Sequence, residues 1–280
     1  MLYDLHVHST ASDGLFTPRQ IIDMALKIGL AGLALTDHDT VDGLESAIDY
    51  IREKEYEIDF IPGIEINTEV GRSEVHILGY FIDYRNTMLN ERLKEIKRAR
   101  SERAIKMIDK LRKMGLIISL AQVKKLTRGD LIGRPHIARA LMEKAYVFSE
   151  KEAFEKYIGQ GKPAYVPRYR FLPEEAIDLV KNAGGIPVLA HPGLISDQDL
   201  ISGVIDMGIE GIEIYYPEHD QMQIKKYIEL ARKNHLVITG GSDFHGTDEG
   251  SGRSRLGITG ITQDLMRKLL DKKSEIKQKK

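Results

Sequence analysis

Residues 2–8, Leu2-Tyr3-Asp4-Leu5-His6-Val7-His8, form a short apolar run that contains two histidines one residue apart. Successive side chains of a β-strand point to opposite faces, so His6 and His8 project from one side and Leu5 and Val7 from the other. A helix pattern follows, with Thr17 as capping residue and Pro18 at the first helical position. We therefore expect a strand that carries two imidazoles on one face, followed by a helix.

The alternation of strand and helix continues along most of the chain. Further strands are predicted over residues 31–36, 58–66, 75–81, 186–190, 209–215 and 236–239. Helices are predicted over residues 19–28, 41–52, 173–182, 198–207, 221–234 and 263–271. Seven short strands, most of them followed by helices, favour parallel βαβ units, either closed as a barrel or open as a doubly wound sheet.

Residues 87–161 interrupt this alternation. The helices predicted there cover residues 87–114, 120–126, 135–144 and 150–158, with no strand between them. We interpret 87–161 as a helical insertion domain within an α/β domain formed by 1–86 and 162–280.

Composition excludes several classes of protein. The 280 residues contain no cysteine, which excludes a disulfide scaffold, a thiolate metal site and a cysteine nucleophile. No apolar run reaches the length of a membrane span, and the first strand starts at Leu2 with no leader-like segment before it. We therefore expect a cytoplasmic protein without a membrane partner.

The net charge of -1 conceals a basic segment. Residues 91–128 contain 13 Lys and Arg against 4 Asp and Glu, a balance of +9, which leaves -10 for the rest of the chain. A segment of this kind suits a polyanion such as RNA, and a solvated helix face explains it equally well.

Histidines and carboxylates gather at or near the ends of the expected strands. They are His6, His8, Asp13, His38, Glu65, His76, His191, Asp243 and His245. Carboxyl ends of parallel strands share one rim, so we expect these groups to converge. Imidazole and carboxylate without thiolate suit Mn, Fe or Zn, and nine such groups exceed the needs of one ion. Each of these residues taken alone could have a structural role. However, six of the chain's nine histidines lie at or near expected strand ends, and this favours a site for two or three ions.

The motifs carrying these residues resemble the PHP (polymerase and histidinol phosphatase) family of metal-dependent phosphoesterases. They are His6-Val7-His8, Thr36-Asp37-His38-Asp39, Gly63-Ile64-Glu65, Val75-His76, Ala190-His191-Pro192 and Ser242-Asp243-Phe244-His245. The segments Gly133–Arg139 and Gly161–Pro167 are similar to the branch that includes 3',5'-nucleoside bisphosphate phosphatases and 5'-to-3' exoribonucleases.

The resemblance implies a distorted seven-stranded (β/α) barrel of PHP type and a site for two or three divalent ions. Manganese is the first choice, with iron or zinc as alternatives. By analogy, one ion is held by His6, His8, Glu65 and Asp243, a second by Asp13, His38 and His245, and a third by Glu65, His76 and His191. Asp37 and Asp39 are expected to orient ligands rather than to bind an ion.

The implied reaction is hydrolysis of a phosphate ester of a nucleotide. The expected substrates are the 3'-phosphate of nucleoside 3',5'-bisphosphates and short 5'-phosphorylated RNA. A metal-bridging hydroxide, held by Asp13, His38, Glu65 and His245, would attack phosphorus in line.

Substrate contacts are predicted mainly at the start of the helix over 135–144. Arg134 and His136 lie there, where a guanidinium and free backbone N–H groups suit a phosphate. Lys162 and Arg168 are weaker candidates. Glu213 and His219 are assigned to the sugar or base, and a structural role for both is equally open.

Other interpretations compete with this one. Leu33–Val41 fits the DxDx[TV] motif of haloacid dehalogenases, with Asp37 as nucleophile and Asp39 as general acid, but that fold has no use for six rim histidines. An amidohydrolase also begins with HxH, yet it would not explain Asp13 or the segment from Gly133 to His136. A phosphatase for another small phosphomonoester, such as histidinol phosphate, and a non-catalytic metal-binding module are the remaining alternatives.

Overall fold

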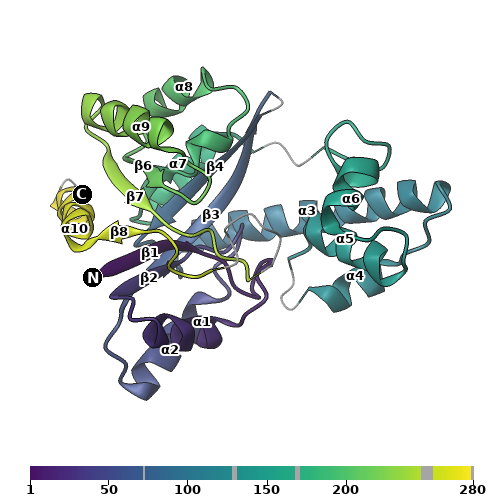
Figure 1. Ribbon diagram of the computed structural model, residues 1–280, viewed down its shortest axis with the longest axis horizontal. Coiled ribbons are helices and arrows are strands. Elements are labelled where there is room, and N and C mark those ends of the chain that lie inside the picture. Colours follow the sequence, from purple (N-terminus) through teal and green to yellow (C-terminus); the bar gives the residue numbers. More distant parts are fainter. Residues whose placement is uncertain (72, 128–130, 168–170, 247–254, 279–280) are drawn as a thin grey trace.

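The computed structural model describes residues 1–71, 73–127, 131–167, 171–246 and 255–278 (Figure 1). Within these ranges, eight strands form one sheet in the order β7-β6-β5-β4-β3-β2-β1-β8. The strands are β1 (Leu2–Val7), β2 (Gly32–Leu35), β3 (Asp59–Val70), β4 (Ser73–Tyr80), β5 (Ile186–Leu189), β6 (Gly211–Tyr215), β7 (Val237–Gly240) and β8 (Ile261–Thr262).

The sheet curls until the segment after β7 meets β1. Val7 pairs with Phe244 in a parallel bridge, and the backbone N–H of His8 donates to the carbonyl of Phe244 at 2.9 Å. Gly241 permits this approach, because a Cβ at that position would lie 2.3 Å from the backbone nitrogen of His6. The junction places the residues that follow β7 beside the two histidines of the first strand.

The expected fold class, a distorted α/β barrel, is confirmed, and the strand count differs by the short strand β8. The expected parallel pairing is present between β1 and β2, β2 and β3, β5 and β6, and β6 and β7, whereas β4 runs antiparallel to both β3 and β5. Only residues 71 and 72 separate β3 from β4. A parallel connection needs a crossover of a dozen or more residues, so these two strands can pair only as a hairpin.

Helices cover the outside of the barrel. In Figure 1, α1 and α2 lie on one side and α7, α8 and α9 on the other, with α10 near the C-terminus. Their bounds are α1 (Pro18–Lys27), α2 (Leu44–Lys54), α7 (Pro173–Asn182), α8 (Leu200–Asp206), α9 (Gln221–Lys233) and α10 (Gln263–Gln278). Thr17 caps α1 as predicted, accepting from the backbone N–H of Gln20, and Ile21, Ile22 and Ala25 bury its inner face.

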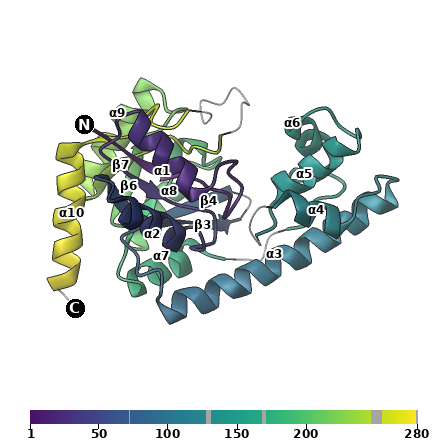
Figure 2. The same cartoon turned by 90° about the horizontal axis from the view of Figure 1, so that it is seen from below.

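The remaining helices stand to one side of the barrel and are connected to it along α3 (Figures 1 and 2). They are α3 (Thr87–Lys113), α4 (Leu120–Leu126), α5 (Arg134–Glu143), α6 (Glu150–Ala153) and a π-helical turn η1 (Phe154–Ile158). A 3-10 turn, η2 (Pro192–Leu194), belongs to the barrel instead. Leu93 and Ile96 of α3 belong to the barrel core, whereas Met107 and Leu111 belong to a second core with α5. We propose that 87–161 form an insertion domain on this basis. No helix in the described part of the chain is long and apolar enough to cross a lipid bilayer.

Candidate metal centre

The structure brings together all nine residues predicted to converge. They come from the barrel strands and the loops that follow them, and most are deeply buried: His6, His8 and Glu65 are 0% exposed. His6 lies on β1, Glu65 on β3 and His76 on β4, and the other members lie in loops after strand ends.

Glu65 occupies the middle of the group. One carboxylate oxygen, Oε2, lies 3.2 Å from Nε2 of His6, 3.2 Å from Nε2 of His8 and 2.9 Å from Nδ1 of His38. The other, Oε1, lies 2.8 Å from Nδ1 of His76 and 3.0 Å from Nε2 of His191. A single carboxylate therefore faces five imidazoles, an arrangement suited to a ligand shared between cations.

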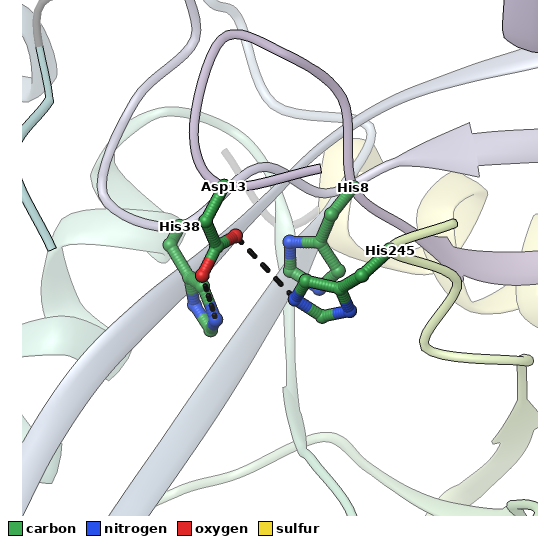
Figure 3. A group of neighbouring side chains, drawn as sticks. All are labelled: His8, Asp13, His38 and His245. Atoms are coloured by element: carbon green, nitrogen blue, oxygen red, sulfur yellow. Dashed lines mark ion pairs between the residues drawn. The ribbon is translucent and has the colours of Figure 1, made fainter. Parts of the chain in front are cut away.

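Three overlapping sets of ligand atoms, each within 4.8 Å of one another, are present in the described residues. They are His8, Asp13, His38 and His245; His6, His8, Glu65 and Asp243; and His38, Glu65 and His76. Figure 3 shows the first set, with Asp13 facing His38 and His245. The second set is the one implied by the family resemblance. The other two sets differ from the expected ones: His8 is added to the first set, and His38 stands in the third set where the resemblance placed His191. His191 still lies beside the group, with Nε2 3.0 Å from Oε1 of Glu65.

Several buried atoms of the group make no hydrogen bond within the described ranges. They are Nε2 of His6, Nδ1 and Nε2 of His8, Oδ1 of Asp13 and Oε2 of Glu65. Buried polar atoms that make no hydrogen bond are costly and rare, and neutral imidazole and carboxylate are ligands of divalent transition metals. The donor set therefore fits two or three such ions.

The charges of the site keep its carboxylates ionised. Burial raises the pKa of Asp13, but the neighbouring His245 and His38 outweigh burial and hold that pKa well below its usual range. The pKa of Glu65 is lowered in the same way, against burial, by His38, His6 and His76. Burial lowers the pKa of His8, and the carboxylates Asp243 and Glu65 reverse this and raise it to about 10. Protons and metal ions thus compete for the same nitrogen atoms.

Glu213, predicted to bind the sugar or base, lies behind the ligands instead. It is 0% exposed, with Oε1 3.0 Å from Nδ1 of His6. Its Oε2 accepts from the backbone N–H of His191 at 2.8 Å, where the φ of His191 is +23°. Glu213 therefore orients one imidazole and holds the strained backbone of another.

His219 is also used internally. Nδ1 lies 2.8 Å from the carbonyl oxygen of Ile214, and Nε2 accepts from the backbone N–H of Gly193 at 3.1 Å. With both ring nitrogens occupied, the geometry argues against the predicted substrate contact.

Asp37 and Asp39 hold loops, in keeping with the expectation that they orient ligands. Asp37 accepts hydrogen bonds from the backbone and hydroxyl of Ser9, both at 2.7 Å, and from the hydroxyl of Ser12 at 2.6 Å. Sequence reasoning missed Tyr216, which donates to Oδ2 of Asp243 at 2.9 Å. No motif marks Tyr216, since the contact joins segments 27 residues apart.

A cleft of about 520 Å³ opens over the candidate metal centre. Its floor includes Asp13, His38, Glu65, His76 and His245, and its opposite wall comes from α5, α6 and η1. The wall residues are Pro135, Arg139, Glu150, Lys151, Phe154 and Glu155. Sequence reasoning missed Arg139, although its spacing of four residues from Pro135 places both on one helix face.

The substrate residues predicted on α5 are engaged within the protein. Arg134 donates to Oε1 of Glu74 at 2.8 Å and lies 5.2 Å from the centre of the Phe154 ring. His136 is 2% exposed, and its Nδ1 accepts from the backbone N–H of Gly133 at 3.0 Å, which argues against a direct substrate contact. Lys162 is exposed in the turn after η1 and is not one of the residues lining the cleft, and Arg168 lies outside the described residues.

Comparisons with known proteins agree with this geometry. The family model of the PHP domain matches residues 4–160. A 3',5'-nucleoside bisphosphate phosphatase of Chromobacterium violaceum is 36% identical over 268 residues, covering 94% of this chain and 92% of the relative. The 5'-3' exoribonuclease Rnm of Escherichia coli is 33% identical over 250 residues, covering 88% of this chain and 85% of the relative.

A solved structure shows the same architecture. A protein from Bifidobacterium adolescentis, described as a metal-dependent phosphoesterase, superposes with a TM-score of 0.85 at 28% identity, covering 96% of this chain and 95% of that one. The similarity thus extends over the barrel and the helices beside it.

Proposed function

The chain belongs to the PHP domain family of metal-dependent phosphoester hydrolases, and from this premise we propose that its substrates are nucleotides. The preferred substrates are nucleoside 3',5'-bisphosphates, cleaved at the 3'-phosphate, and short 5'-phosphorylated RNA. The cleft of about 520 Å³ between the metal centre and the helical wall carries the proposal. Its volume is in the range that encloses small organic ligands.

The residues of the floor would hold the ions and the attacking water. Bound divalent ions acidify water toward a pKa of about 7 and neutralise phosphate charge, and Mn is our first choice over Fe and Zn. Asp13, His38, Glu65 and His245 surround the space in which we expect the water. The carboxylates of Asp13 and Glu65 remain ionised at neutral pH because the surrounding imidazoles lower their pKa values.

The wall supplies groups suited to the rest of a nucleotide. Arg139 and Lys151 offer positive charge for a second phosphate, and Phe154 offers a ring face for a base. Arg139 is held by Glu150, to which Nε donates at 2.6 Å, so its guanidinium is pre-positioned. Arg134 is not one of the residues lining the cleft and pairs with Glu74, so we retain it as a weaker candidate.

RNA contact through residues 91–128 is a further part of the proposal. Some cations of this segment are already paired, among them Arg92 with Glu175 and Arg98 with Glu102. The contact would rest on exposed lysines such as Lys106 and Lys113.

A phosphate-release panel with added Mn tests the proposal. It compares adenosine 3',5'-bisphosphate, AMP, histidinol phosphate and a 5'-phosphorylated RNA oligonucleotide. We expect the bisphosphate to be hydrolysed at least about tenfold faster than AMP or histidinol phosphate. Preference for histidinol phosphate would instead identify a phosphatase for small phosphomonoesters. A steep fall with salt for RNA, absent for the bisphosphate, would support contact with an extended backbone.

A further inference from the structure

We propose that Arg100, on α3, is a positioning residue for the candidate metal centre. Its ion pair with Asp39 fixes the loop that carries His38, so that the helical part of the molecule supports a ligand on the barrel. The inference rests on the proposed function only in taking His38 as a metal ligand.

Arg100 lies where α3 passes from one core to the other. Ile96, one turn before it, packs in the barrel core, and Ala104, one turn after it, packs in the second core. Figure 2 shows α3 running from beneath the barrel to the other helices. Arg100 is itself largely covered, with its side chain 17% exposed. Its position is therefore set from both sides.

The guanidinium of Arg100 is directed at one carboxylate oxygen. Nε donates to Oδ2 of Asp39 at 2.8 Å, and a terminal nitrogen contacts the same oxygen. The side chain of Asp39 is 1% exposed. Removing the cationic partner of a buried carboxylate strongly destabilises the folded conformation around it. This pair therefore holds the loop far more firmly than an exposed pair would.

Asp39 transmits this constraint through Asn67. Its Oδ1 accepts from the backbone N–H of Asn67 at 2.9 Å, and Oδ2 accepts from the side-chain amide at 3.0 Å. The same amide nitrogen lies 3.1 Å from Nδ1 of His38. The contacts thus run without a gap from the guanidinium to an imidazole of the metal centre.

The backbone at Asp39 needs such support. Its φ is +50°, in the left-handed region that few residues other than glycine adopt, aspartate and asparagine more readily than most. Its N–H donates to the backbone carbonyl of Glu65 at 2.8 Å, which connects the loop to the strand residue that bears the central carboxylate. The surrounding contacts therefore stabilise this backbone conformation.

A Mn²⁺ titration of the full, chelator-treated chain tests the proposal directly. Arg100→Met removes the charge, Arg100→Lys retains it, and Arg98→Met is the matched control, since Arg98 is on the same helix with its side chain 83% exposed. We expect Arg100→Met to weaken Mn²⁺ binding at one site by about 10- to 100-fold, Arg100→Lys to recover much of this, and the control to match the wild type. With substrate, kcat should fall while KM changes by less than about twofold.

Two results would overturn the proposal. Wild-type Mn²⁺ affinity with a raised KM in Arg100→Met would make Arg100 a substrate contact. Unchanged affinity and kinetics would give it no role at the site. If Arg100→Met fails to fold by circular dichroism, Asp39→Asn removes the same ion pair and retains a residue that tolerates positive φ, and normal Mn²⁺ affinity in that variant contradicts the proposal. Because the titration needs no substrate, a wild type that binds Mn²⁺ but cleaves no nucleotide refutes the proposed substrates alone.

Discussion

The floor of the cleft and its helical wall are built differently. On the floor, Glu65 and His6 are fully buried, and each has several charged neighbours that fix its orientation. On the wall, the side chain of Lys151 is 84% exposed, and its Nζ lies 3.9 Å from Oε1 of Glu155. A rigid floor suits chemistry that requires fixed ligands, whereas exposed wall residues such as Lys151 can vary with little effect on the barrel. We therefore expect floor substitutions to act on metal binding and kcat, and wall substitutions to act on KM.

The most severe test of the floor is Glu65→Gln. The amide preserves size but removes the charge that faces five imidazoles, so we expect a loss of kcat of about 1000-fold or more. Enzyme-bound Mn, measured by inductively coupled plasma mass spectrometry after gel filtration, should also fall. Near-normal turnover in this variant would show that the group is not the catalytic centre.

The pH dependence of the free energy of unfolding tests whether His136 is a buried residue of α5 or a residue that contacts substrate. Burial lowers the pKa of His136 to about 4 from the usual 6.5, so the native state holds it neutral while the unfolded state takes up a proton first. The contribution of this pKa difference to the free energy of unfolding is about 3 kcal/mol. It is fully present above about pH 6.5 and is lost as the pH falls toward 4.

Urea unfolding of metal-free wild type and His136→Gln at pH 7.5 and pH 4.5 measures this contribution. The stability difference between the two proteins should shrink on acidification. A difference independent of pH would mean that His136 titrates normally and is open to solvent.

Glu213→Gln distinguishes support of the floor from recognition of substrate. Because Glu213 contacts His6 and the backbone of His191, we expect Mn²⁺ affinity or kcat to fall by about 10- to 100-fold, with KM little changed. A raised KM specific to nucleotides, with normal Mn²⁺ binding, would restore the sequence-based assignment to the sugar or base.

The smallest effect is expected on the wall. Lys151→Gln should raise KM for a nucleoside bisphosphate by about threefold and leave kcat and Mn²⁺ binding unaltered, because exposed charges contribute little. Lys156→Gln is the control, since Lys156 pairs with Glu152 at 2.6 Å and does not line the cleft. Equal effects in both variants would indicate general electrostatics rather than a contact in the cleft.

The two regions also differ in how far the sequence predicts them. Strand ends are marked locally by apolar runs, and a barrel brings such ends to one rim, so His6, His38 and Asp243 could be placed together in advance. The strand pattern by itself does not reveal direction, and the antiparallel pairing of β4 with β3 places His76 beside Glu65.

Long-range pairing accounts for most of what the sequence did not show. Arg100 and Asp39 are 61 residues apart, and no sequence pattern around either residue indicates that the two are in contact. His136 and Glu213 were identified as polar residues near the site, but their burial depends on packing that only the folded chain defines. Polar residues behind a site and polar residues facing a substrate have the same appearance in a sequence.

The central claim is that several divalent ions gather around Glu65 and make this cleft a phosphoesterase site. Anomalous diffraction at the manganese edge, from crystals grown with Mn²⁺, tests it most directly. The account predicts two or three peaks among Glu65, His8, His38 and their neighbours, each within coordination distance of imidazole nitrogens and carboxylate oxygens. A map without a peak there, at Mn²⁺ concentrations that support hydrolysis, would contradict it.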